Sequence, residues 1–233
     1  DRTWFTARNF FINLDALLKV YDRSPVEWVR QKALKGAENW MLDHMKGSGG
    51  LGAIYPAMAN SVMALNCLGY KNDDPLVVKA MREIEELEIH DTVMDNGQCV
   101  DALHLQPCHS PIWDTALLIN ALSEAGMSQD HTALQKAATW LISKQTKTVG
   151  DWIISSPGAE PGGWYFQFEN ELFPDVDDSA VVLMALAKVR LPDEEQQRLA
   201  IRRGCRWVTA MQGSDGGWGA YDVDNNRIVF NYI

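Results

Sequence analysis

The sequence predicts an all-α protein whose helices pair and wind into a double-layered α/α toroid, which is a helical barrel. Nearly all-apolar helices alternate along the chain with amphipathic ones. Three of the apolar helices begin 54 and then 64 residues apart, a repeat length typical of stacked helix pairs. No series of strand-like segments competes with this pattern, so we expect helices throughout.

The composition is that of a globular protein with an acidic surface. Of the 233 residues, 46% are hydrophobic, and the formal net charge is −10. A nucleic-acid partner is not expected, because binding phosphates requires a surplus of basic residues. No apolar run is long enough to span a membrane. The chain has no initiator Met and ends in an apolar stretch at 230–233, so we interpret it as a piece of a longer protein.

The three apolar helices share the way in which they begin. Each starts with an Asn or Asp that is followed by Ser or Thr, at Asn60, Asp114 and Asp178. Asn and Asp favour the N-cap position, so Asp178 is expected to cap its helix. All sides of these helices are apolar, which predicts burial on every side. The helix expected at 193–211 is amphipathic, and its charged residues are expected to face water: Glu194, Glu195, Arg198, Arg202 and Arg203.

A second repeated unit joins the helices. It consists of an apolar helix that ends in a Gln, a Gly-rich turn and a Trp. Two full copies occur, Gln145 with Gly150 and Trp152, and Gln212 with Gly216 and Trp218. A degraded copy lies at 36–51. We expect the Gln amide to cap the end of a neighbouring helix and the Trp to stack over the helix end.

Cysteine and histidine give weaker signals. Four cysteines without a CxxC pair are expected to be buried free thiols of a reducing compartment: Cys67, Cys99, Cys108 and Cys205. His104 and His109 lie near Cys108, but we interpret their segment as an irregular loop without the ligand spacing of a metal site. Asp222 and Asp224 resemble the start of a calcium loop, but a basic residue stands where that loop needs Gly. No metal is therefore expected.

Three carboxylates stand within four residues between two apolar runs. They are Asp175, Asp177 and Asp178. In the alignment of the three apolar helices, Asp175 and Asp177 have no acidic counterpart. Crowded carboxylates that are removed from water keep their protons well above the usual pKa. The cluster is therefore a candidate Brønsted acid.

These features together resemble the squalene-hopene cyclases, the bacterial class II triterpene cyclases. The resemblance rests on the Asp-Val-Asp-Asp-Ser-Ala motif at 175–180 and on the segments at 110–115, 162–168 and 217–225. The two Gln…Gly-x-Trp units match the QW motifs of that family. Ser179 stands where the family commonly has Thr. A Gly-Gly-Trp run that is often found near residues 96–100 is absent.

The resemblance implies a fold and a division of the chain. The family has two α/α toroids, one inserted in the other, with a large apolar cavity between them. Residues 1–108 are then the C-terminal part of the inserted toroid, and 109–233 are the DxDD-bearing part of the second toroid. Neither toroid is closed by this chain.

The resemblance also implies a mechanism without a cofactor or a metal. Asp177 is the proton donor to a terminal alkene, and Asp175 and Asp178 support it. A histidine that completes this network in the family lies beyond the end of this chain. The aromatic residues expected to stabilise the carbocations, by about 0.5–2 kcal/mol each, are Trp113, Phe166 and Tyr221. From the residues alone, each of these three aromatics can equally be a core or turn residue.

Three functions are compatible with the sequence. The first is an isomerase that cyclises squalene to pentacyclic hopanoids, hopene or hopanol. The second is a related class II cyclase that acts on a prenyl diphosphate, which needs a basic patch; the nearest basic residues, Lys188 and Arg190, lie three turns from the acid motif. The third is a non-catalytic α/α toroid that binds a protein or lipid. This function does not explain why Asp175 and Asp177 depart from the helix repeat.

The family resemblance implies a polyprenyl substrate, squalene, and a peripheral, monotopic location on the cytoplasmic face of the bacterial inner membrane. It also leaves a homodimer possible. Apolar residues near the start of the chain are candidates for bilayer contact: Phe5, Phe10, Phe11, Leu14, Leu17 and Leu18. At helical spacing such residues belong more often to a protein core.

Overall fold

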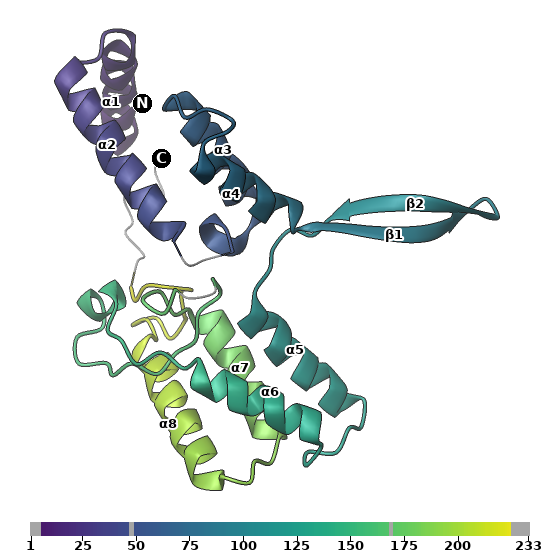
Figure 1. Ribbon diagram of the computed structural model, residues 1–233. Helices are drawn as coiled ribbons and strands as arrows, with labels where there is room; N and C mark the ends of the chain where they lie inside the picture. Colours follow the sequence, from purple (N-terminus) through teal and green to yellow (C-terminus); the bar gives the residue numbers. More distant parts are fainter. Residues whose placement is uncertain (1–5, 47–48, 168–169, 225–233) are drawn as a thin grey trace. The chain divides into compact units, whose positions relative to one another are not determined.

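The computed structural model describes residues 6–46, 49–167 and 170–224, and most of them are helical (Figure 1). The chain divides into two compact units, Asp1–Asp43 with Asp224–Ile233 and His44–Val223. In the first unit, α1 (Ala7–Arg23) begins after Thr6, whose hydroxyl accepts a hydrogen bond from the Asn9 amide at 3.2 Å. Helix α2 (Glu27–His44) follows.

Helix α1 exposes several large apolar side chains. They are Phe10, Leu14, Leu17 and Leu18. Phe11 is partly buried, and Phe5 lies outside the described residues. Within the described part of the chain, no helix has the length and apolar character needed to cross a bilayer.

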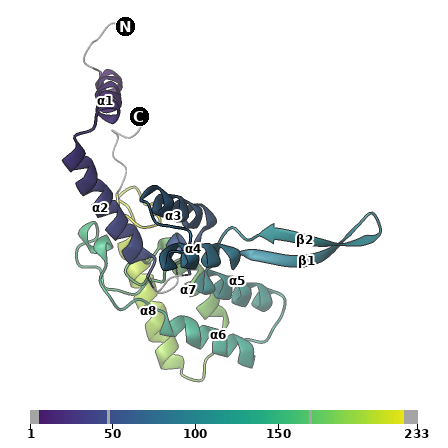
Figure 2. The same cartoon turned by 45° about the horizontal axis from the view of Figure 1, so that its top comes forward.

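The second unit carries the remaining elements. Its helices are η1 (Leu51–Ala53), α3 (Tyr55–Cys67), α4 (Pro75–Glu85), α5 (Pro111–Glu124), α6 (Thr132–Ser143), η2 (Asp151–Ile154), α7 (Val176–Lys188) and α8 (Glu194–Ala210). Helices α5 to α8 lie side by side (Figures 1 and 2), and α7 contacts each of the other three. As predicted, the charged residues of α8 named above are exposed.

The core among α5 to α8 fixes the position of α7. Ile112 of α5, Leu141 of α6 and Leu186 of α7 are completely buried there. Trp164 is also completely buried, and its indole nitrogen donates to the Leu141 carbonyl oxygen at 2.7 Å. Burying one large apolar side chain contributes about 1.5–3 kcal/mol. Helix α7, which carries the acid cluster, is therefore held by packing along its length.

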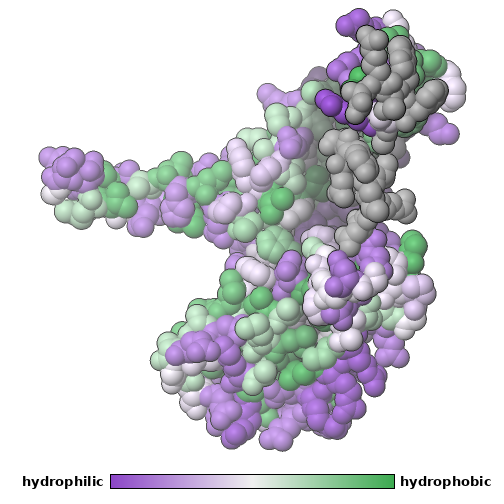
Figure 3. All heavy atoms as spheres, turned by 180° about the vertical axis from the view of Figure 1, so that it is seen from behind, coloured by the Kyte–Doolittle hydropathy of each residue, from purple (hydrophilic) through white to green (hydrophobic). Residues whose placement is uncertain are grey.

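The apolar helices are not buried on every side, so this expectation is wrong for the described residues. Met63 of α3, Leu118 of α5 and Met184 of α7 are 55%, 58% and 57% exposed. Figure 3 shows apolar residues on the surface of the part that contains α5 to α8, in the lower half of the view. In the described part of the chain, each of these helices packs with one face and exposes apolar side chains on another.

The predicted all-α class is confirmed, although the described residues also form a β-hairpin that the sequence pattern did not predict. Strands β1 (Glu88–Asp95) and β2 (Gln98–Leu105) pair antiparallel (Figure 1). Asn96 and Gly97 join them with φ of 48° and 81°, which is the conformation that a tight two-residue hairpin turn requires. His104 lies in β2 and not in an irregular loop.

The cysteines are free, as predicted, but most are not buried. Cys67, Cys99 and Cys205 are exposed, and Cys108 is partly buried. Cys99 lies on strand β2 of the hairpin, and Cys205 lies in α8. The expected burial therefore fails for three of the four thiols.

Candidate active site

The acid cluster forms the first turn of α7. Asp175 is the N-cap residue, and its Oδ1 accepts a hydrogen bond from the Asp178 amide at 2.8 Å. The prediction that Asp178 caps the helix is wrong. All three apolar helices begin earlier than their Asn or Asp suggests, at Tyr55, Pro111 and Val176. Asp175 thus has a structural role that the repeat alignment did not indicate.

The three carboxylates differ in their exposure. Asp175 is 3% exposed and Asp178 is 2% exposed, whereas Asp177 is exposed. Consecutive residues of a helix point in different directions, so one turn presents carboxylates both to the core and to the surface. Asp175 Oδ2 and Asp178 Oδ1 are buried and have no hydrogen-bond partner among the described residues. The sequence prediction that part of the cluster is buried is confirmed.

Burial makes the inner carboxyl pair hard to ionise. Burial raises the pKa of Asp178 to about 9, and the negative charges of Asp175, Asp177 and Asp114 add to this rise. The pKa of Asp175 is raised as well, chiefly by burial, although its interactions with Asp178 oppose the rise. One carboxyl group of the pair therefore holds a proton at neutral pH.

Asp114 is a fourth acidic residue whose charge acts on Asp178. The sequence pattern indicated only that it lies at the start of a helix. It lies in the first turn of α5, which packs against α7. Its alignment with Asp178 was the signal that pointed to it. The negative charge of Asp114 helps to keep Asp178 protonated, because it raises the pKa of the Asp178 carboxyl group.

Two segments from elsewhere in the chain fix the start of α7. The Asp175 amide donates to the Trp164 carbonyl oxygen at 2.9 Å, in an isolated antiparallel bridge between these residues. The Val176 amide donates to the Ala220 carbonyl oxygen, also at 2.9 Å. The first amide groups of a helix have no partner within the helix. These contacts satisfy part of that need and locate the acid cluster.

The predicted aromatic residues lie in three separate segments of the chain. Phe166 follows Trp164 by two residues and is partly buried. Its backbone amide interacts with the Asp175 carboxyl group and lowers the pKa of that group. Tyr221 is 52% exposed, and its pKa is raised by burial and by the charges of the acid cluster. Trp113, partly buried, precedes Asp114 in α5. Tyr221 and Phe166 are thus near the carboxylates.

The two Gln…Trp units act differently from the expected helix caps. Gln145 donates to the Gly162 and Ala200 carbonyl oxygens at 2.7 and 2.8 Å, and Ala200 lies inside α8 and not at its end. Gln212 donates to the Gly216 carbonyl oxygen within its own turn. These bonds tie loops to each other and to α8, so helix capping is wrong for both Gln residues.

The two tryptophans of these units hold the chain together in different ways. Trp152 is buried and meets Trp207 edge to face, with 6.0 Å between the ring centroids. Trp218 donates from its indole nitrogen to the Val208 carbonyl oxygen near the end of α8, at 2.8 Å. Trp218 thus contacts the last turns of α8 by a hydrogen bond, and stacking of its ring over the helix end stays a prediction.

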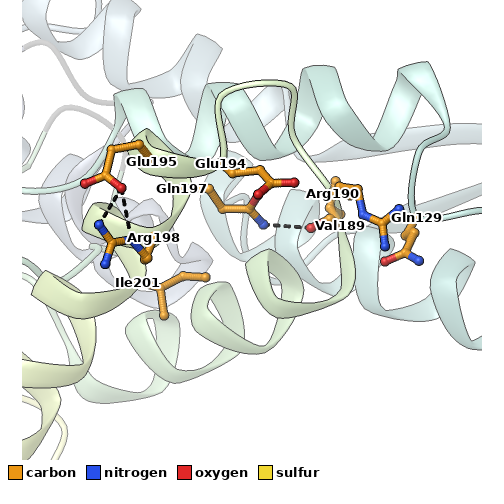
Figure 4. A pocket seen from close by; sticks show the side chains of 8 residues that line it. All are labelled: Gln129, Val189, Arg190, Glu194, Glu195, Gln197, Arg198 and Ile201. Atoms are coloured by element: carbon orange, nitrogen blue, oxygen red, sulfur yellow. Dashed lines mark hydrogen bonds and ion pairs between the residues drawn. The ribbon is translucent and has the colours of Figure 1, made fainter.

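A pocket at the far end of α7 has a different chemistry (Figure 4). It is lined by Gln129, Val189, Arg190, Glu194, Glu195, Gln197, Arg198 and Ile201. Both of its arginines are paired with acidic residues, Arg190 with Asp130 at 3.8 Å and Arg198 with Glu195. The pocket wall therefore carries charged side chains beside its apolar ones, and it lies apart from the acid cluster. In the described part of the chain, no group of His, Cys, Asp and Glu is arranged to hold a metal ion.

Two family models match the chain. The squalene-hopene cyclase C-terminal domain matches residues 109–233, and the squalene-hopene cyclase N-terminal domain matches residues 1–92. The two models together cover most of the sequence. The domain boundary expected at residue 108 remains a prediction.

Several curated proteins are similar to this chain. A squalene-hopene cyclase of Alicyclobacillus acidocaldarius is 41% identical over 223 residues, which are 96% of this chain and 34% of that protein. A squalene-hopene cyclase of Zymomonas mobilis is 39% identical over 238 residues, 100% of this chain and 35% of that protein. A dammaradiene synthase of Dryopteris crassirhizoma is 39% identical, with 96% of this chain and 31% of that protein covered. The chain spans about a third of the length of these relatives.

Proposed function

Because the chain belongs to the squalene-hopene cyclase family, we propose that the protein that carries it cyclises squalene to pentacyclic hopanoids, hopene and hopanol. The reaction is an isomerisation that begins when an aspartic acid protonates a terminal alkene. The observation that carries this proposal is the acid cluster at the start of α7, in which a buried carboxyl pair adjoins an exposed carboxyl group.

Asp177 is the proposed proton donor. A general acid has to touch the atom that it protonates, and Asp177 is exposed while its two acidic neighbours are buried. Asp175 and Asp178 support it. Because one carboxyl group of this pair is protonated and neutral at neutral pH, the repulsion between the three acidic groups of the turn is reduced.

The inner pair has two oxygen atoms that no described residue pairs with. Asp175 Oδ2 and Asp178 Oδ1 are buried polar atoms without a partner among the described residues, and such atoms are costly to leave unsatisfied. The histidine that the family resemblance implies is a suitable partner, because an imidazole N–H donates to a carboxylate oxygen. That hydrogen bond would fix which oxygen of the pair holds the proton.

Phe166, Tyr221 and Trp113 are the proposed stabilisers of the carbocations. Aromatic faces attract cations by their quadrupole, and they do not add to a carbocation as water does. Phe166 and Tyr221 adjoin the acid cluster, so they suit the first cations formed after protonation. Trp113 sits on the first turn of α5, which packs against α7.

A water-insoluble substrate reaches the enzyme from a bilayer, so we propose peripheral membrane attachment. The exposed apolar residues of α1 support this location, because burying apolar surface in the interfacial region is favourable. Phe10 and Leu17 are 63% and 68% exposed and are the residues that best suit such contact.

The test is the substitution Asp177→Asn in the whole native protein that carries this chain. Asn keeps the shape of the side chain but has no acidic proton, so squalene turnover should fall by about 10²-fold or more. Incubation with squalene and mass spectrometry of the products measure it. Asp193→Asn is the matched control: it changes another Asp at a helix start, where Asn also caps well. Unchanged pentacyclic product from Asp177→Asn would refute the assignment.

A further inference from the structure

Ser179 makes hydrogen bonds that reach beyond its own helix. Its side chain is completely buried in the first turns of α7. The hydroxyl group donates to the Asp175 carbonyl oxygen at 2.6 Å and accepts from the Trp164 amide at 2.8 Å. The Trp164 carbonyl oxygen in turn accepts from the Asp175 amide at 2.9 Å. The three residues therefore form a closed ring of hydrogen bonds between the 162–166 segment and the acid turn.

The helix repeat shows that this arrangement is not required by the fold. Ser61 occupies the position in α3 that aligns with Ser179, and it is also buried. Among the described residues, its hydroxyl group makes a single hydrogen bond, which it donates to the Met58 carbonyl oxygen three residues earlier in the same helix, at 2.7 Å. A buried Ser in a helix usually satisfies itself in this way. The additional bond from Trp164 distinguishes the helix that carries the acid cluster.

The 162–166 segment connects the Ser179 contact with Phe166. Trp164 is fixed at its indole by the bond to Leu141 and at its backbone by Ser179 and Asp175. Gly163 leaves no space for adjustment, because a Cβ atom there would lie 2.7 Å from the Trp207 ring and 2.9 Å from the Ser179 oxygen. The partly buried Phe166 follows two residues later. The Ser179 hydroxyl group is therefore one of the contacts that fix the segment carrying Phe166 next to the acid cluster.

We propose that Ser179 is a positioning residue that holds the Phe166 segment and the acid turn as one unit. This inference rests on the proposed cyclisation. When the Phe166 segment and the acid turn are fixed together, the ring of Phe166 lies at a defined distance from the proton donor and can stabilise the cation. When they are loosened, the cation loses its stabilising face and gives up a proton before all rings have closed.

The test compares three substitutions in the whole native protein. Ser179→Ala removes the hydroxyl group. Ser179→Thr keeps the hydroxyl group, and Ser61→Ala removes the aligned hydroxyl group from a helix without the acid cluster. We expect Ser179→Ala to lower squalene turnover by about tenfold or more and to raise the share of products with fewer than five rings, since small displacements in an active site cost up to about 10²-fold. Ser179→Thr should keep the turnover and the product pattern of the native protein. Ser61→Ala should also leave the turnover and the product pattern unchanged.

Stability and activity are measured together so that a structural effect is recognised. Thermal unfolding followed by circular dichroism is recorded for each variant. Ser179→Cys, which replaces the hydroxyl group with a weakly hydrogen-bonding thiol, is used in place of Ser179→Ala if the latter does not fold. If Ser179→Ala or its Cys replacement lowers only the unfolding temperature and leaves the product pattern unchanged, the inference is wrong. It is also wrong if Thr does not restore the pattern.

A double substitution tests the route through Phe166. If Ser179 acts by placing that ring, adding Ser179→Ala to Phe166→Leu should not change the product pattern further. Additive changes would overturn the inference. Asp177→Asn tests the proposed function separately, because pentacyclic product from that variant would refute the acid assignment whatever Ser179 does.

Discussion

Asp178 makes the stability of the native fold depend on pH. Its pKa is about 9 in the folded chain, whereas an Asp in an unfolded chain has a pKa of about 3.9. The folded state therefore binds a proton that the unfolded state releases between these values. The contribution of Asp178 to the free energy of unfolding is fully present below about pH 4 and is lost as the pH rises toward about 9. Asp178→Asn cannot lose a proton, so this loss should disappear.

Urea unfolding of the whole native protein between pH 5 and 9 measures this difference. For one proton the free energy of unfolding of the native sequence should fall by up to about 1.4 kcal/mol per pH unit relative to Asp178→Asn. Asp193→Asn, which changes an exposed cap, should keep the native slope. Parallel slopes for the native protein and Asp178→Asn would show that Asp178 ionises normally in the fold.

The acid cluster was predictable from sequence, but the roles of its members were only partly so. Three carboxylates next to apolar runs indicated a buried acidic group, and two of the three are buried. The alignment assigned capping to Asp178, because Asn and Asp at the aligned positions look like caps. In the structure Asp175 has the extended backbone of an N-cap, with φ of −124° and ψ of 159°. Sequence patterns do not show such a one-turn shift, since the start of the helix is fixed by hydrogen bonds that the Asp175 and Val176 amides donate to the Trp164 and Ala220 carbonyl oxygens.

At the scale of the elements, the first Gln…Trp turn depends on a glycine for space. A Cβ atom at Gly150 would lie 1.9 Å from the Leu172 carbonyl oxygen and 2.9 Å from the Trp152 ring. Gly150→Ala should therefore destabilise the protein by about 1–3 kcal/mol, the usual cost of overpacking. The thermal unfolding temperature of the whole native protein measures it.

Gly36 gives the matched control for that substitution. It lies in α2, it is exposed, and a Cβ atom there meets nothing within 4 Å. Gly36→Ala should raise stability by about 0.5–1 kcal/mol, because Ala loses less conformational freedom than Gly in a helix. If both substitutions shift the unfolding temperature in the same direction, the close approach at Gly150 does not limit that turn.

The helices were predictable because their periodicity is long and regular, whereas the hairpin was missed. Asn96-Gly97 is a strong turn signal, but the flanking strands mix apolar, acidic and histidine residues without strict alternation. In Figure 3 apolar and polar residues are interspersed along this hairpin. Hydrogen bonds between the strands hold it, and they leave little trace in the hydrophobic pattern.

For the whole molecule, the exposed face of the apolar helices bears on activity. A neutral acid protonates an alkene only where water does not compete for the proton, yet Asp177 is exposed in this chain. Leu118 and Met184, on the helices that pack together beside the acid turn, are also exposed. The chain spans about a third of the length of its curated relatives. The surfaces that would enclose the reaction are thus not supplied by the described residues.

We therefore predict that the isolated 233-residue chain does not cyclise squalene, while the whole native protein that carries it does. Asp177 is open to water, which competes with the alkene, and among the described residues no donor orients Asp175 Oδ2 and Asp178 Oδ1. Equal amounts of both proteins, incubated with squalene in detergent and compared by mass spectrometry of the products, measure the difference. Circular dichroism shows whether the isolated chain has the helix content of its structure. Turnover by the isolated, folded chain would mean that α5 to α8 alone exclude water from Asp177.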